Sequence, residues 1–117
     1  MKRVKVTVIN HDENIQTCLY NGVIKDEAKV IRYYDVDGSL NELMFQNKDI
    51  LEIKRQTKEV KTTLYLAKEN AKAHVETLEG AFDIPIAVSK TIFKEELISV
   101  TYNTGEEIEI MIEFFKE

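Results

Sequence analysis

Residues 107–114 read EIEIMIEF, and a large apolar side chain stands at every second position of this stretch. Successive side chains of a β-strand point to opposite faces of the sheet. A period of two therefore predicts a strand with one face towards a core and the other towards water. Glu107, Glu109 and Glu113 would then form a carboxylate face in solvent.

The same alternation recurs along the whole chain, in short windows separated by polar breaks. The windows are 4–8, 15–19, 31–33, 43–45, 51–53, 64–66, 82–88 and 98–102. So many short strands exceed the usual strand content of a domain, and closure into a barrel accommodates them because it removes exposed sheet edges. We predict one all-β domain over residues 1–117, an antiparallel meander closing into a β-barrel of about 8–10 strands.

The predicted core follows from the two longest alternating windows. It comprises Phe82, Ile84, Ile86, Val88, Ile108, Ile110, Ile112 and Phe114.

Turn residues support the meander. Asp37-Gly38 supplies the positive-φ pair of a tight hairpin, and Asn103-Thr104-Gly105 marks the last hairpin. Lys48-Asp49 is a polar break between two strand windows. Pro85 cannot donate to a β-ladder, which predicts an edge strand or a bulge, and Gly80 before that strand allows a sharp bend.

Residues 67–78 allow two interpretations. Ala67, Ala71, Val75 and Leu78 recur at helical spacing, which indicates a helix. The alternation over residues 73–77 indicates a strand instead and keeps the rhythm of the meander. We prefer the strand.

Composition excludes several classes of protein. The 117 residues contain 16 Lys+Arg and 21 Asp+Glu, a net charge of −5, which argues against a nucleic-acid partner. A lone Cys rules out a disulfide framework, and no apolar run approaches the ~20 residues of a membrane span. We expect a cytoplasmic protein with no membrane partner and no cofactor.

No catalytic or metal-binding motif is present. The chain lacks phosphate-binding loops, nucleophile elbows, H-E-x-x-H and C-x-x-C, which argues against an enzyme without excluding one. His11-Asp12-Glu13 matches no ligand spacing and predicts a solvated turn, and His74 is expected to point to water. We expect no metal site.

Parity within strands selects a candidate site. Asp35 shares a face with Tyr33, Arg55 with the apolar face of its strand, and Thr77 with Val75. Buried ions need partners, so we predict that Arg55 and Asp35 form a bidentate pair, with the hydroxyls of Tyr33 and Thr77 completing it. Two interpretations stay open. The network closes one end of the barrel, or Arg55 anchors the head of a small ligand.

An ordered set of short motifs also resembles a known family. The motifs are Gly22, Ile31-Arg32-Tyr33-Tyr34-Asp35, Ile53-Lys54-Arg55, Thr77-Leu78-Glu79-Gly80 and Ile98-x-Val100-x-Tyr102. Together they resemble the YwiB-like bacterial family, a domain of unknown function with a calycin-like, lipocalin-related β-barrel. The resemblance covers nearly the whole chain and implies a barrel and a cytoplasmic location, but no activity.

Position by position, the family pattern matches Tyr33, Asp35, Arg55, Thr77 and Gly80. The chain departs from it at three positions, with Gln56 in place of a glycine and Val75 and Glu79 in place of tyrosines. These departures leave fewer polar groups at the end of the site that the resemblance implies.

The resulting expectation is a non-enzymatic binding protein. It would hold a small apolar or acidic molecule in the barrel, with Tyr33, Asp35, Arg55 and Thr77 as ligand-binding residues, and would be a monomer or a homodimer. The alternative is a protein–protein interaction or scaffold module with a filled barrel, which binds through a strand edge near Pro85 or through the acidic last strand. An enzyme is the third hypothesis.

Overall fold

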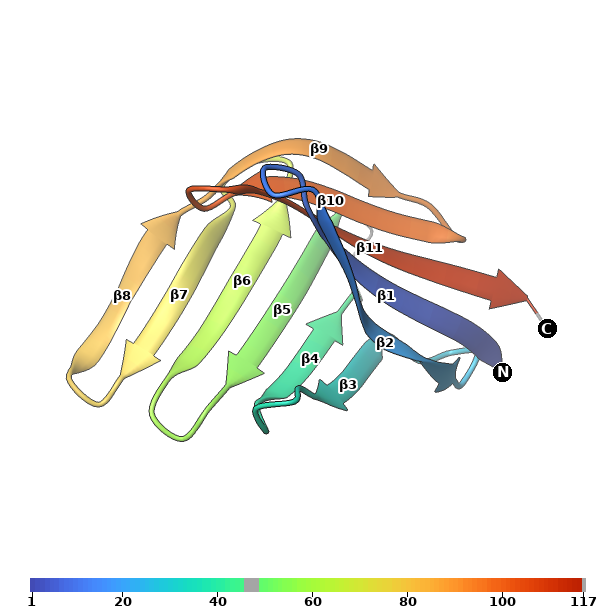
Figure 1. Cartoon of the computed structure of the whole chain (residues 1–117), viewed down its shortest axis with the longest axis horizontal. Coiled ribbons are helices and arrows are strands. Elements are labelled where there is room, and N and C mark those ends of the chain that lie inside the picture. Colours follow the sequence, from blue (N-terminus) through green and yellow to red (C-terminus); the bar gives the residue numbers. More distant parts are fainter. Residues whose placement is uncertain (46–48, 117) are drawn as a thin grey trace. The chain divides into compact units, whose positions relative to one another are not determined.

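Eleven antiparallel strands and no helix make up the described part of the chain, residues 1–45 and 49–116 of a computed structural model (Figure 1). The all-β, antiparallel prediction is confirmed, and the number of strands exceeds the predicted 8–10. The described residues hold no helix that could cross a membrane. Two compact units are present, Met1–Ala28 with Ala87–Glu117, and Lys29–Ile86.

The first unit contains a five-stranded sheet in the order β2-β1-β11-β10-β9. Its strands are β1 (Lys2–Asn10), β2 (Ile15–Ile24), β9 (Ala87–Phe93), β10 (Leu97–Asn103) and β11 (Glu107–Lys116). The stretch quoted first thus forms most of β11, the central strand, which pairs with β1 and β10.

The second unit is a six-stranded meander in sequence order (Figure 1). Its strands are β3 (Val30–Tyr34), β4 (Leu40–Met44), β5 (Ile50–Gln56), β6 (Lys61–Ala67), β7 (Lys72–Thr77) and β8 (Gly80–Pro85). Because β7 contains all of residues 73–77 and no helix occurs in the described residues 67–78, the strand interpretation is confirmed and the helix is wrong. In the described residues both sheets are open, with edges at β2 and β9 in one and at β3 and β8 in the other.

The apolar face of the first sheet is built from even-numbered positions. Val4, Val6 and Val100 are fully buried. Ile110 and Ile112 of β11 are also buried, as predicted. These side chains face one another across β1, β11 and β10, because Val6 lies opposite Ile112 and Val100 opposite Ile110. Val88, Ile108 and Phe114 belong to the predicted core but are only half-buried.

The second sheet buries Ile31, Leu43, Leu51 and Leu66, and also Ile53, Ala71, Ala73 and Ile86. Phe82 and Ile84 were predicted to lie in the core, and that prediction is wrong. They are 51% and 47% exposed because β8 is an edge strand, with a neighbour on one side only. Parity places them on the apolar face correctly, but an edge position leaves that face uncovered.

The β3–β4 hairpin differs in detail from its prediction. Asp35 N–H donates to Ser39 O and Gly38 N–H to Asp35 O, so the loop has three residues instead of two. Only Gly38 has positive φ (86°), as in a type I turn followed by a left-handed residue.

The predictions for the last hairpin and for Pro85 are confirmed. Gly105 has a φ of 100° in the β10–β11 turn, and Pro85 lies on an edge strand. Lys48 of the predicted Lys48-Asp49 break lies outside the described residues.

The burial of the first sheet yields a stability prediction. Ile112→Ala should lower the free energy of unfolding by about 2–5 kcal/mol, because it leaves a cavity beneath a fully buried position. Ile15→Ala, at a 52% exposed position of β2, should change it by less than about 0.5 kcal/mol. Urea denaturation followed by circular dichroism measures both, and equal losses would contradict this assignment of the core.

Candidate functional site

Register in the second sheet aligns a row of side chains across six strands. The row consists of Tyr33, Asn41, Arg55, Thr62, Val75 and Phe82, each opposite the next. The adjacent row on the same face consists of Ile31, Leu43, Ile53, Leu64, Ala73 and Ile84. We call this side of the sheet the apolar face. Arg55 therefore lies on the apolar face, as parity predicted.

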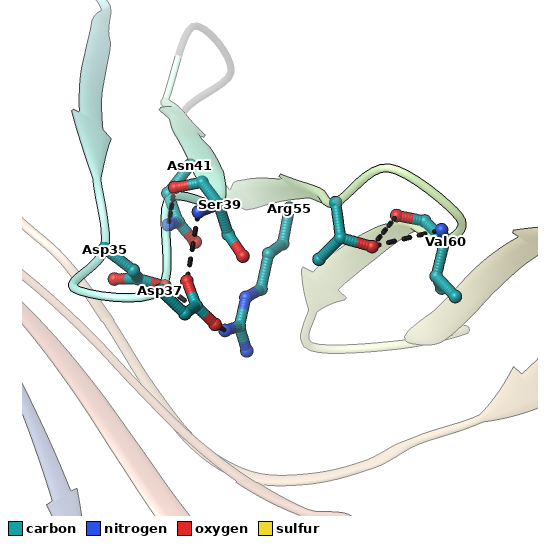
Figure 2. Close-up of polar contacts among 7 residues, drawn as sticks. Asp35, Asp37, Ser39, Asn41, Arg55 and Val60 are labelled. Atoms are coloured by element: carbon teal, nitrogen blue, oxygen red, sulfur yellow. Dashed lines mark hydrogen bonds and ion pairs between the residues drawn. The ribbon is translucent and has the colours of Figure 1, made fainter.

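Arg55 forms ion pairs with two aspartates of the β3–β4 turn (Figure 2). Its Nη2 donates a hydrogen bond to Asp37 Oδ2 at 2.9 Å and lies 3.4 Å from Asp35 Oδ2. The predicted Arg55–Asp35 pair is thus present. Its predicted bidentate, buried form is wrong, because both carboxylates approach one nitrogen and the Arg55 side chain is 50% exposed.

Thr77 takes no part in this network. Its hydroxyl donates to Gly80 O at 3.0 Å and accepts the Glu79 N–H at 3.2 Å, which closes the β7–β8 turn. The predicted bond from Thr77 to the Arg55–Asp35 pair is therefore wrong. Tyr33 is half-buried and lies opposite Asn41, two strands from Arg55.

Asp37 is the residue that sequence reasoning missed. Its Oδ1 accepts the Ser39 N–H at 3.0 Å, an Asx-type turn that points the other oxygen towards Arg55 (Figure 2). Hydrogen bonds from the Ser39 backbone and hydroxyl, followed by the charge of Arg55, lower the pKa of Asp37. The Asp-Gly-Ser turn was the available signal, since Asp at this position commonly bonds two residues ahead.

The opposite face of the second sheet is polar. Arg32, Glu42, Lys54, Thr63, His74 and Asp83 form one cross-strand row on it. His74 Nδ1 lies 2.6 Å from Asp83 Oδ1, and His74 Nε2 lies 3.2 Å from Glu76 Oε1. The bonds to Asp83 and then to Glu76 raise the pKa of His74, so its predicted orientation towards open water is only partly right.

Glu109 departs from the predicted carboxylate face of β11. Its side chain is only 18% exposed; Oε2 accepts the Ser99 hydroxyl at 2.7 Å and Oε1 lies 2.9 Å from His11 Nε2. Burial raises the pKa of Glu109, but Ser99, His11 and Lys90 outweigh it and lower that pKa overall. Ser99 bonds the carboxylate and not the imidazole, so this trio lacks the base-to-nucleophile contact of hydrolases.

No group of three or more potential metal ligands occurs among the described residues. A small cavity of about 180 Å³ lies in the first unit, between the β9–β10 turn and the ends of β1 and β11. It is smaller than the ~300–1,000 Å³ of typical ligand sites and does not include Arg55.

Comparison with known proteins supports the fold. No family model matches the chain, and no curated protein matches it at a significant level. Among solved structures, the chain is similar to the crystal structure of the YwiB protein from Bacillus subtilis. The TM-score is 0.61 at 14% identity, over 99% of this chain and 91% of that chain. At 14% sequence identity, this likeness shows a YwiB-like fold and nothing further.

The turn around Arg55 generates a pH prediction. Arg55→Met should raise the Asp37 pKa part of the way to its ordinary value, because the Ser39 bonds remain. The lowered pKa means that the stabilising contribution of Asp37 is present above its ordinary pKa and is lost as pH falls through the lowered one. NMR titration of the carboxyl carbon measures the pKa of Asp37. Arg32→Met, on the polar face, is the matched control and should leave Asp37 unchanged; equal effects would contradict the contact.

His74 generates a second pH prediction. Asp83→Asn should lower the His74 pKa, because the strongest bond to the imidazolium loses its charge. In the parent chain, the contribution of His74 to stability is full below the ordinary His pKa of about 6.5 and is lost as pH rises through the raised value. Proton NMR of the imidazole reports the pKa, with Asp26→Asn as control. An unchanged His74 titration in Asp83→Asn would refute the assignment.

Proposed function

We propose that this chain is a non-enzymatic binding protein that holds a small apolar molecule with a hydrogen-bond-accepting head group on the apolar face of its second sheet. One observation carries the proposal. A solvent-accessible guanidinium, that of Arg55, lies in one cross-strand row with the exposed apolar side chain of Phe82.

The dimensions of the row suit an elongated amphipathic ligand. Arg55 and Phe82 are separated by three strand spacings, which is about 14 Å at ~4.8 Å each. Thr62 and Val75 lie between them and are half-buried, and Ile84 extends the apolar surface beside Phe82. A medium-length acyl chain could cover this stretch with its head at Arg55.

The charges around Arg55 determine how a ligand head group binds there. Arg55 and the two aspartates together carry one net negative charge, so a free anion is not attracted to the cluster as a whole. An acidic head binds by taking the place of Asp37 on the guanidinium, and this exchange costs little because exposed ion pairs are weak. A neutral acceptor can instead use the guanidinium nitrogens that Asp37 does not engage. Both routes depend on Arg55.

Two finer expectations belong to the same proposal. A calycin-like, lipocalin-related β-barrel would enclose the ligand, and the protein would act in the cytoplasm. An interaction module is the second candidate function, because edge strand β8 is exposed along its whole length.

The ligand proposal is tested with dodecanoate and dodecanol, which share a tail and differ in head group. Displacement of 1-anilinonaphthalene-8-sulfonate fluorescence should show binding of both to the parent chain. Arg55→Met should weaken dodecanoate binding about tenfold, the size of one charge-assisted hydrogen bond, and dodecanol binding less.

Arg32→Met is the matched control, since Arg32 is an exposed arginine of the same sheet on its polar face. It should leave both affinities unchanged. Absence of binding by the parent chain, or equal losses in the two variants, would refute the proposal.

A further inference from the structure

Strand β8 ends the second sheet and is exposed along its whole length. All six residues of Gly80–Pro85 are exposed, and in the described chain β7 is the only strand that pairs with it (Figure 1). Phe82 and Ile84 lie on the apolar face, and Asp83 lies on the polar face. The strand therefore offers unpaired backbone groups together with two large apolar side chains.

Hydrogen-bond alternation shows which backbone groups of β8 face outward. Ile86 N–H donates to Ala71 O at 3.0 Å, so these two residues form a hydrogen-bonded pair at the end of the β7–β8 ladder. Hydrogen-bonded and non-hydrogen-bonded pairs alternate in an antiparallel ladder. The even-numbered residues of β8 therefore bond to β7, whereas Ala81, Asp83 and Pro85 direct their backbone groups to the free edge. Pro85 offers only its carbonyl there, since it has no N–H.

We propose that β8 is a homodimerisation edge, which pairs antiparallel with β8 of a second copy of this chain so that the two Phe82 residues lie directly opposite each other. In this register Ala81 of each copy exchanges two backbone hydrogen bonds with Asp83 of the other. Four bonds then join the two sheets across a twofold axis.

Neighbouring symmetric registers are less favourable. Centring the pair on Asp83 would oppose two carboxylates and set Ala81 against Pro85, where one hydrogen bond is missing. Centring it on Ile84 would set Asp83 against Pro85, with the same loss. Only the register centred on Phe82 uses every outward N–H between Ala81 and Asp83 and avoids like charges in opposition.

The apolar side chains of β8 fit the register centred on Phe82. The two Phe82 rings meet in a non-hydrogen-bonded pair, where cross-strand side chains approach most closely. Ile84 of each copy lies opposite Gly80 of the other, whose added Cβ would meet no atom within 4 Å. Burial of these two exposed apolar side chains adds to the four hydrogen bonds.

A second copy fits this edge better than a foreign strand for two reasons. The outward backbone groups of Ala81 in one copy complement those of Asp83 in the other, and a twofold pair uses the β8 edges of both copies, so no further chain adds at β8. An edge carboxylate normally discourages strand addition. Here His74 at 2.6 Å and Lys72 at 3.7 Å partly offset the charge of Asp83.

Register-specific cross-linking tests the proposal in a Cys18→Ser background, which removes the exposed native thiol. Phe82→Cys should form an intermolecular disulfide under mild oxidation, because directly opposed residues have Cα atoms within bonding reach. Ile84→Cys is the matched control on the same face. The two copies of position 84 would be four residues apart along the strand, about 13 Å, which is too far for a disulfide.

Sedimentation velocity over a concentration series provides the second readout. Cys18→Ser alone should dimerise reversibly. Ala81→Pro in the same background should remain a folded monomer, because it removes an N–H that β7 does not use. A monomeric parent, cross-linking of Ile84→Cys as efficient as that of Phe82→Cys, or undiminished dimerisation of Ala81→Pro would each overturn the proposal. All three measurements are made without added ligand, so a failure of the dimer proposal is distinguishable from a failure of ligand binding even though both proposals use Phe82.

Discussion

Cross-strand register in the six-stranded sheet is the constraint on which the structure of the second unit depends. A slip of one residue in any strand would turn its whole apolar row to the polar side. Hairpin geometry prevents that slip. Asp35 and Ser39 close the β3–β4 loop around Gly38, and Thr57 and Val60 close the β5–β6 turn. With these turns in place, the side chains of Leu51, Ile53 and Arg55 all lie on the apolar face of the sheet.

The ion pairs of Arg55 follow from this register and do not create it. A half-exposed guanidinium beside exposed carboxylates adds little to stability, because water competes for each partner. The apolar rows, with Leu43, Leu51 and Leu66 fully buried, supply most of the driving force. Arg55 is therefore free to exchange partners at small cost to the fold, which is what a ligand anchor requires.

Alternation predicted the strands and their faces well, since a period of two is a local property of the chain. Parity, together with the expectation that inward-pointing charges pair, also predicted the Arg55–Asp35 contact. It failed where burial depends on a neighbouring strand: Phe82 and Ile84 have the right parity but lie on an edge. Glu109 shows the converse, because Ser99 and His11 from neighbouring segments cover a carboxylate that parity assigned to solvent.

One measurement tests the register most directly. In an antiparallel sheet, the α-protons of a non-hydrogen-bonded pair lie close enough for a strong nuclear Overhauser effect, and Asn41 and Arg55 form such a pair between β4 and β5. A NOESY spectrum of labelled protein should contain the Asn41–Arg55 α-proton cross-peak. A cross-peak from Asn41 to Lys54 or Gln56 in its place would put Arg55 on the polar face and contradict the account.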